Sequence, residues 1–538
     1  MHSTQLSWRI FWILATVIPI GFLGTFFAWP VVAMAARGLT TSAFVEVLGA
    51  PRTWRIVWQT VWMALAGTLG SLVAGIPGAY VLYRLTFPGR ALARVVATVP
   101  FVLPTVVVGV AFHAAFASRE DLASSTTAVV IAMVFFNFSV VVRTVGTLWE
   151  KLSPQQEAAA ATLGASPLRV FLTVTAPQLA PAVAASAGLV FLFCSTAYGI
   201  VLTLGKPGYG TVETEMWVQT VTFLNLDRAA VFSLIQCVIV TAAVVVSVRL
   251  SARYERHLTG QDTYSHPISR HDIPVVVAVA VFTVVVIVLP LATIVVKSLA
   301  GGGRAYRLLS TSGAGYAGGI TAWEALGNSL VTALVAAVIA LVVGVGIALV
   351  VSRTPTTRIA TVVVRGVDIL ALTPLGVSAV TVGFGFFITL VGVVERPVLV
   401  PLAQAVVALP LVTRALVPVL RAIEPGQREA AATLGASPWR VLATIDLAGA
   451  RRGLGVALGF ALAMSIGEFG ATSFLASAQY VTLPVLIVRL LGRPGADNYE
   501  MALAASVILG IVTAVLMVGA AALGAQAKNT RRKVEVAR

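Results

Sequence analysis

The sequence predicts an all-α, polytopic membrane protein with twelve transmembrane helices in two parallel repeats of six. Three observations lead to this prediction. The 538 residues are 58% hydrophobic and only 11% charged, with a mean hydropathy of +0.95, whereas soluble proteins carry roughly 25% charged residues. Apolar runs long enough to cross a bilayer recur along the whole chain. The chain also repeats itself at an offset of about 270 residues.

The apolar runs are predicted to be helices because helices satisfy every backbone hydrogen bond within one segment. Strands of a membrane barrel would alternate apolar and polar residues instead. The first run is longer than the core of a signal peptide, and we interpret it as a true membrane helix. The predicted spans are residues 10–33, 56–83, 95–117, 127–148, 179–203 and 229–248, then 274–297, 327–352, 367–391, 398–420, 453–476 and 502–524.

The distribution of basic residues predicts the orientation. An even number of spans places both termini on one side. If that side is the cytoplasm, 25 of the 37 Lys and Arg residues lie inside and 12 outside. An excess of Lys and Arg in cytoplasmic loops is the rule for membrane proteins. We therefore expect cytoplasmic termini in a bacterial plasma (inner) membrane, and the net charge of +16 needs no nucleic-acid partner.

The internal repeat divides the chain. We predict a first permease repeat over 1–250, a cytoplasmic linker over 251–272 and a second repeat over 273–538. Arg143 and Gly164 recur as Arg414 and Gly435 at an offset of 271. Both copies have the same orientation, and such parallel repeats place a pathway on or near the axis that relates them. The glycine-rich outer stretch 297–326 is expected to form a loose surface loop.

One motif occurs in both halves, between the fourth and fifth spans. Residues 157–169 read Glu-Ala-Ala-Ala-Ala-Thr-Leu-Gly-Ala-Ser-Pro-Leu-Arg, and residues 429–440 read Glu-Ala-Ala-Ala-Thr-Leu-Gly-Ala-Ser-Pro-Trp-Arg. The glycine suits a left-handed helix cap, and Ser-Pro suits the start of a second helix. We predict a cytoplasmic helix–turn–helix whose small side chains admit a partner protein. A helix that lies on the membrane surface is the alternative, and two equivalent copies argue against it.

These loops, at about 150–178 and 422–450, resemble the EAA loops of ABC-importer permeases. The second copy has the expected residues of that motif, but Ala448 stands where proline is usual. In the first copy Glu157 is one position early, Ala158 takes the position of the motif glutamate, and the proline is present. The matching residues are Ala159, Gly164 and Pro177 in the first copy, and Glu429, Ala430, Ala431 and Gly435 in the second.

The resemblance implies a type I ABC-importer permease fold in which each loop couples to one of two ATPase subunits, with an extracytoplasmic solute-binding protein as a further partner. The fused arrangement is similar to thiamine and ferric-iron importer permeases. Segments 135–137, 465–470 and 482–484 are most similar to the thiamine type. Thiamine, thiamine pyrophosphate, ferric iron and an oxyanion remain open as solutes. A secondary, ion-coupled transporter is the alternative class, although it would need a relay of charges inside the membrane.

Two residues are candidates for the pathway. Glu468 is the one acid in the interior of a predicted span, away from the span's ends, and its repeat mate Ala197 is followed by Tyr198. Glu468 either lines the pathway and attracts a cationic solute, or packs against neighbouring backbone. Glu213 and Glu215 are expected in an outer loop, as solvated charges or as contacts for a binding protein.

The sequence contains no nucleotide-binding loop, no catalytic motif and no clustered metal ligands. Cys194 and Cys237 are the only cysteines, and we interpret both as core residues. We therefore expect a transporter subunit rather than an enzyme, with no cofactor in this chain and ATP hydrolysis on separate subunits.

Overall fold

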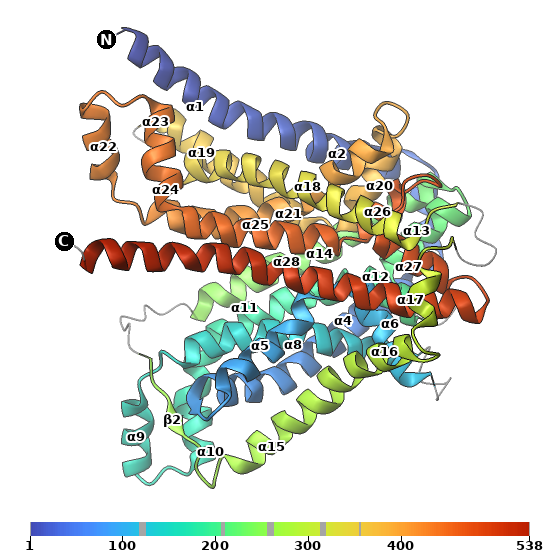
Figure 1. Ribbon diagram of the computed structural model, residues 1–538, viewed down its shortest axis with the longest axis horizontal. Helices are drawn as coiled ribbons and strands as arrows, with labels where there is room; N and C mark the ends of the chain where they lie inside the picture. The colour runs from blue at the N-terminus through green and yellow to red at the C-terminus, as the bar shows by residue number, and fades with distance from the viewer. Residues whose placement is uncertain are drawn as a thin grey trace.

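The computed structural model describes residues 2–117, 125–205, 210–254, 263–312, 319–353 and 357–536. Within these ranges, ten helices are long and apolar enough to cross a membrane, or up to twelve if each of two bent helix pairs counts as one span. The described chain is helical apart from one pair of two-residue strands and an isolated bridge. The prediction of an all-α polytopic protein is confirmed (Figure 1). Residues 255–262 of the linker and 313–318 of the glycine-rich loop lie outside the described residues.

The first half begins with a span formed by α1, η1 and α2 and continues to α14. Its elements are α1 (His2–Leu23), η1 (Gly24–Ala28), α2 (Trp29–Thr40), α3 (Ala43–Gly49), α4 (Pro51–Ala79), η2 (Tyr80–Arg84), β1 (Leu85–Thr86), α5 (Arg90–Val102), α6 (Thr105–Phe116), α8 (Thr126–Trp149), α9 (Pro154–Thr162), α10 (Pro167–Val170), η3 (Phe171–Thr175), α11 (Ala176–Ser195), α12 (Tyr198–Leu204), α13 (Val212–Trp217), η4 (Val218–Thr222) and α14 (Leu226–Tyr254).

The second half follows the strand β2 (His266–Pro267) and repeats most of this order, although among the described residues η2 and η4 occur only in the first half and η6 and α24 only in the second. It contains α15 (Ile273–Phe282), η5 (Thr283–Val288), α16 (Leu289–Leu299), α17 (Arg304–Leu308), α18 (Ala322–Val351), α19 (Arg358–Leu372), η6 (Thr373–Gly376), α20 (Ala379–Thr389), α21 (Arg396–Arg421), α22 (Pro425–Thr433), α23 (Pro438–Val441), η7 (Leu442–Asp446), α24 (Leu447–Gly449), α25 (Arg451–Ile466), α26 (Gly470–Leu475), α27 (Leu483–Leu491) and α28 (Ala496–Val536). The elements α9, α10 and η3 recur as α22, α23 and η7 with every boundary shifted by 271 residues.

Four of the predicted spans are interrupted rather than continuous. The third span bends by 103° between α5 and α6, at Leu103 and Pro104, because proline disfavours helical geometry in the residue before it. The predicted span 367–391 is divided by the 3-10 turn η6. The predicted spans 179–203 and 453–476 end as long helices at Ser195 and Ile466 and continue as the short helices α12 and α26.

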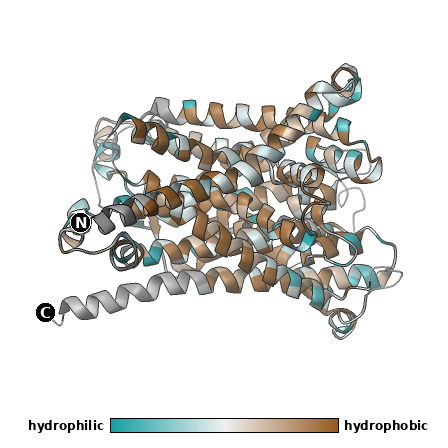
Figure 2. Ribbon diagram, turned by 90° about the horizontal axis from the view of Figure 1, so that it is seen from above, coloured by the Kyte–Doolittle hydropathy of each residue, from teal (hydrophilic) through white to brown (hydrophobic). Residues whose placement is uncertain are grey.

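The first span of each half packs against the other half. The helix α1 contacts α18 and α19, while α16 contacts α6 and α15 contacts α4. Figure 1 shows α1 beside α18 and α19 along one side of the molecule, with α15 and α16 along the opposite side. Apolar residues occupy the long helices, and polar residues gather at the two ends of the bundle (Figure 2), as a bilayer requires.

The described end of the linker is attached to the first half. Its strand β2 pairs in parallel with β1, which follows the second span. The Tyr264 amide donates to the Glu150 carbonyl at 2.7 Å, and the Tyr80 hydroxyl donates to Asp272 at 2.6 Å. These contacts place the connection between the halves beside α9 and η3 (Figure 1).

Candidate functional site

The loop helices α9 and α22 end in the same way. At each C-terminus a glycine adopts the left-handed conformation, with φ of 83° at Gly164 and 81° at Gly435. The Ala165 amide donates to the Ala160 carbonyl, and the Ala436 amide donates to the Ala431 carbonyl, which is the hydrogen-bond pattern of a Schellman cap. Glycine is required here because a Cβ atom disfavours positive φ.

A second short helix follows each glycine. Ser166 and Ser437 are the N-cap residues of α10 and α23, and their hydroxyls accept hydrogen bonds from the amides of Arg169 and Arg440. Proline follows each serine in the first helical turn. The structure therefore contains the predicted helix–turn–helix in both halves. Figure 1 places α9 and α22 at the same end of the molecule as both chain termini.

Both helices are exposed. Neither α9 nor α22 has a buried residue, and Ala158, Ala159, Glu429 and Ala430 are all open to solvent, while Ala431 is half-buried. The leucines that precede the capping glycines, Leu163 and Leu434, are each 89% exposed. Leu168 and its repeat mate Trp439 are also exposed, at 68% and 51%. Paired apolar side chains in open positions indicate a surface that another protein covers.

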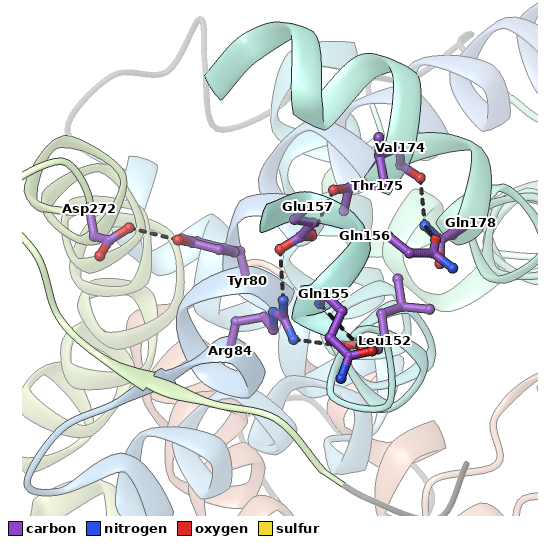
Figure 3. A network of polar contacts seen from close by, with 11 residues as sticks. Tyr80, Arg84, Leu152, Gln155, Gln156, Glu157, Val174, Thr175, Gln178 and Asp272 are labelled. Atoms are coloured by element: carbon purple, nitrogen blue, oxygen red, sulfur yellow. Dashed lines mark hydrogen bonds and ion pairs between the residues drawn. The ribbon is translucent and has the colours of Figure 1, made fainter. Parts of the chain in front are cut away.

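A buried arginine at the end of the second span holds the first loop. The side chain of Arg84 is 4% exposed, and its Nη2 lies 2.9 Å from Glu157 Oε2. Its Nη1 donates to the Leu152 carbonyl at 2.9 Å. The Thr175 hydroxyl donates to Glu157 Oε1 at 2.7 Å. Figure 3 shows the Arg84–Glu157 pair, with Leu152 beside Arg84 and Thr175 beside Glu157.

The second loop is also held by a buried ion pair, but here the loop helix carries the base and the following segment carries the acid. Asp446 is buried, and it forms ion pairs with Arg353 at 2.8 Å and with Arg428 at 2.7 Å. Arg428 also donates to the Ile423 carbonyl at 3.1 Å. At the offset of 271, Arg428 occupies the position of Glu157, and Asp446 occupies the position of Thr175. The acid has therefore moved from the loop helix to the segment that follows it.

This exchange separates the two glutamates that the motif appeared to equate. Glu157 faces inward to Arg84, whereas Glu429 is exposed on α22. Ala158 is the true positional mate of Glu429. The loops also differ at the proline position. In the first half, where Pro177 is present, one continuous helical segment runs from Pro167 to Ser195. In the second half, where Ala448 replaces it, the chain bends by 76° before α25.

A cavity of about 200 Å³ lies between the two halves at the interrupted spans. Tyr198 and Phe469, which are repeat mates, meet at its wall. Their rings are stacked, with centroids 5.1 Å apart and an interplanar angle of 11°. Residues from α5, α8, α11, α20 and α25 also line it. The two short helices that follow the breaks, α12 and α26, begin at this cavity.

The sequence suggested that Glu468 lies inside a continuous span, but the structure does not place it there. It stands in the break between α25 and α26 and is 6% exposed. Its Oε1 accepts from the Ala471 amide at 2.7 Å, and its Oε2 accepts from the amide and hydroxyl of Thr472 at 3.0 and 2.5 Å. The carboxylate thus binds the first amides of α26, where a negative charge is stabilised. It also contributes to the wall of the cavity.

The expectation of solvated outer-loop charges was wrong for Glu213 and Glu215. Both lie on the short helix α13 and are buried, at 1% and 6% exposure. Glu215 pairs with Arg52 at 3.2 Å and accepts from Gln219 at 2.8 Å. Glu213 lines the cavity instead. Sequence reasoning missed it because the segment is too short to register as a membrane-embedded helix.

A cavity between two membrane-spanning halves, with an equivalent exposed loop helix on each half, is the architecture of a membrane transport protein. Residues 66–256 match the family described as the binding-protein-dependent transport system inner membrane component. The sulfate transport system permease protein CysT of Salmonella typhimurium (strain LT2) is 30% identical over 242 residues, covering 42% of this chain and 87% of that protein. The chain belongs to this family of ABC-importer permeases. It is a transport subunit rather than an enzyme.

Two further similarities were found. The thiamine transport system permease protein ThiP of Brucella abortus (strain 2308) is 28% identical over 490 residues, which is 86% of each chain. A solved structure of the MetNI methionine ABC transporter in inward-facing conformations has 14% identity and a TM-score of 0.33, and the match covers 40% of this chain and 100% of that one. With the family established, the secondary-transporter alternative is set aside.

Proposed function

We propose that this permease imports thiamine or its phosphate esters. The observation that carries the proposal is the similarity to thiamine permeases over 86% of both chains, which spans both halves and the linker rather than one repeat. The sulfate permease matches only 42% of this chain. Ferric iron, which the sequence left open, receives no support from these relatives.

Each exposed loop helix would dock on one ATPase subunit. The supporting observations are the equivalent positions of α9 and α22 and their exposed leucines, Leu163 and Leu434. In this arrangement the loops face the cytoplasm, and so do both chain termini, which lie at the same end (Figure 1). An extracytoplasmic solute-binding protein would deliver solute at the opposite end. The repeats 1–250 and 273–538 then act as two permease halves joined by their linker. We propose no cofactor for this chain.

Movement of a loop would reach the cavity through a rigid helix. In the first half, α10, η3 and α11 form one helical run from Pro167 to Ser195, and Tyr198 follows directly. Closure of the two ATPase subunits on ATP would push α9 and α22 together. The far ends of α11 and α25 would then shift relative to each other. Because Tyr198 and Phe469 stack across the two breaks, their separation would open the pathway through the cavity.

The proposal is tested by uptake of labelled thiamine and labelled ferric iron, measured side by side in a deletion strain and its complemented parent. Loss of thiamine uptake alone in the deletion strain is the expected result. Loss of iron uptake alone, or no loss of either, would contradict the proposed solute. In the latter case the importer class would still hold, because it rests on the family rather than on the solute.

A further inference from the structure

The central cavity contains a buried acid whose charge no described residue balances. Glu213 is 1% exposed. Its Oε1 accepts a hydrogen bond from Gln236 Nε2 at 3.3 Å, and the Ser378 hydroxyl is a second polar neighbour of this carboxyl. No described residue makes a hydrogen bond of normal geometry to Oε2. The ion pairs of the described chain include none to Glu213, although its neighbour Glu215 pairs with Arg52. A buried carboxylate without a partner is unfavourable, so this oxygen is expected to meet a group that arrives from the cavity.

The second acid at the cavity cannot take that role. Both oxygens of Glu468 are occupied by the amides of Ala471 and Thr472 and by the Thr472 hydroxyl. Glu468 adds negative potential to the cavity, but its hydrogen-bonding capacity is committed to α26. Glu213 therefore has the oxygen available to a ligand, and Glu468 strengthens the preference for a positive charge.

The remaining walls favour an aromatic solute. The cavity is lined by six aromatic side chains from both halves: Phe101, Phe136, Phe193, Tyr198, Phe460 and Phe469. Aromatic faces attract cations and stack on flat rings. A hydrated metal ion is disfavoured because no group of three or more His, Cys, Asp or Glu residues lies together in the described chain. An anion is disfavoured by the two carboxylates.

Each of these acids occurs in only one copy of the internal repeat. At the offset of 271, Glu213 corresponds to Pro484 and Glu468 corresponds to Ala197. Gln236, which binds Glu213, corresponds to Val507. A residue needed for the common fold would be expected in both copies. The acids occur in one copy each, at the cavity where the halves meet, and this distribution fits an asymmetric solute.

We propose that the central cavity is an intramembrane binding site for a small heteroaromatic cation, with Glu213 Oε2 facing the positive ring and the Tyr198–Phe469 wall stacking on it. The inference rests on the proposed function and narrows it. Thiamine has a permanently cationic thiazolium ring, whereas the diphosphate of thiamine pyrophosphate gives that ester a net negative charge. The site therefore selects unphosphorylated thiamine, and the volume of about 200 Å³ suits a small ring system.

The test is equilibrium binding of labelled thiamine to the purified permease–ATPase complex, without the binding protein. Glu213→Gln preserves the size of the side chain and removes its charge. We expect binding at least ten-fold weaker than in the wild type, because the cation loses the charged carboxylate oxygen that faces it. Glu215→Gln, on the same helix but paired outside the cavity, is the matched control and should bind as the wild type does. Equal binding by the wild type and Glu213→Gln would overturn the proposal.

A second measurement uses only the wild-type complex and so does not depend on any variant folding. The neutral pyrimidine and thiazole fragments of thiamine, and thiamine pyrophosphate, are added as competitors against labelled thiamine. We expect each to compete at least ten-fold less well than unlabelled thiamine. Equal competition by the neutral fragments would refute a charge-selective site. Either refuting result would leave ATP-driven uptake of thiamine by the intact strain unchanged, so failure of this site is distinguishable from failure of the proposed function.

Discussion

The exchanged ion pairs that hold the two loops can be tested by copying one loop into the other. Glu157→Arg gives the first half the arginine that the second half has at Arg428. On its own this change removes the partner of Arg84, whose side chain is 4% exposed, and places two guanidinium groups together. Adding Thr175→Asp supplies the acid that the second half has at Asp446. The double variant therefore recreates the arrangement of the second half within the first.

The structure sets the size of the expected effect. Breaking a fully buried ion pair costs about 3–5 kcal/mol. The Glu157 side chain is 29% exposed, so solvent screens part of the loss, and about 2 kcal/mol is a reasonable figure. This corresponds to a change of roughly thirty-fold in the equilibrium between the held and released positions of the loop. The double variant should recover most of it.

The assay is the ratio of thiamine transported to ATP hydrolysed in proteoliposomes that contain the permease, its ATPase and its binding protein. Glu157→Arg should keep ATP hydrolysis but lower the ratio several-fold, and the double variant should restore it. Gln155→Arg is the control, because it introduces an arginine at an exposed position on the same helix. A double variant as impaired as the single one would refute the reasoning, and so would a normal ratio in Glu157→Arg.

Three other perturbations follow from the same geometry. Gly435→Trp should abolish uptake without preventing membrane insertion. The new side chain would occupy a left-handed backbone position that disfavours non-glycine residues by roughly 1–2 kcal/mol, and it would cover the proposed docking surface on α22. Wild-type uptake by this variant would contradict the prediction. Leu434→Asp should reduce co-purification of the ATPase by more than the same change at Leu69, which is 61% exposed on the long helix α4. Equal recovery would argue against docking at α22. Glu468→Ala should lower the thermal unfolding midpoint of the solubilised protein by removing the acceptor at the start of α26, worth about 1 kcal/mol or more, and an unchanged midpoint would show that the cap is dispensable.

The loop helices could be predicted because their signals are local. Ser-Pro at a helix start and glycine at a helix end act through the backbone of their own turn, and Gly164 and Gly435 have the left-handed φ that the sequence indicated. The breaks in the interrupted spans were harder to predict from the sequence. Apolar residues continue through the breaks at Leu103 and Thr196, so hydropathy alone gives unbroken spans. Pro104 and Pro374 mark two of these breaks in the sequence.

The candidate site was predicted only in part. Tyr198 and Glu468 do meet at one cavity, but Glu213 was assigned to a surface loop because nothing in a short polar-apolar segment indicates that it folds back between spans. The exchange of charges between the loops was hidden for a different reason. The sequence offset of 271 aligns Glu157 with Arg428 and Thr175 with Asp446. It does not show that Glu157 pairs with Arg84, or that Asp446 pairs with Arg428. Side chains that substitute for one another across a contact become visible only when both partners are placed in space.

The crossing of the first spans has a consequence for how the chain is made. The partners of α1 on α18 and α19 begin at residue 322, so the ribosome must synthesise the entire first half and the linker before α1 can be covered. Until then its apolar surface faces lipid, and the first half is incomplete. The covalent connection ensures that the helix completing each half is present in a one-to-one ratio and at high effective concentration. Two halves made as separate chains would have to associate after synthesis, and each half could pair with another copy of itself. Fusion therefore fixes the identity of the pair, which matters when the two halves carry different acids at a shared cavity.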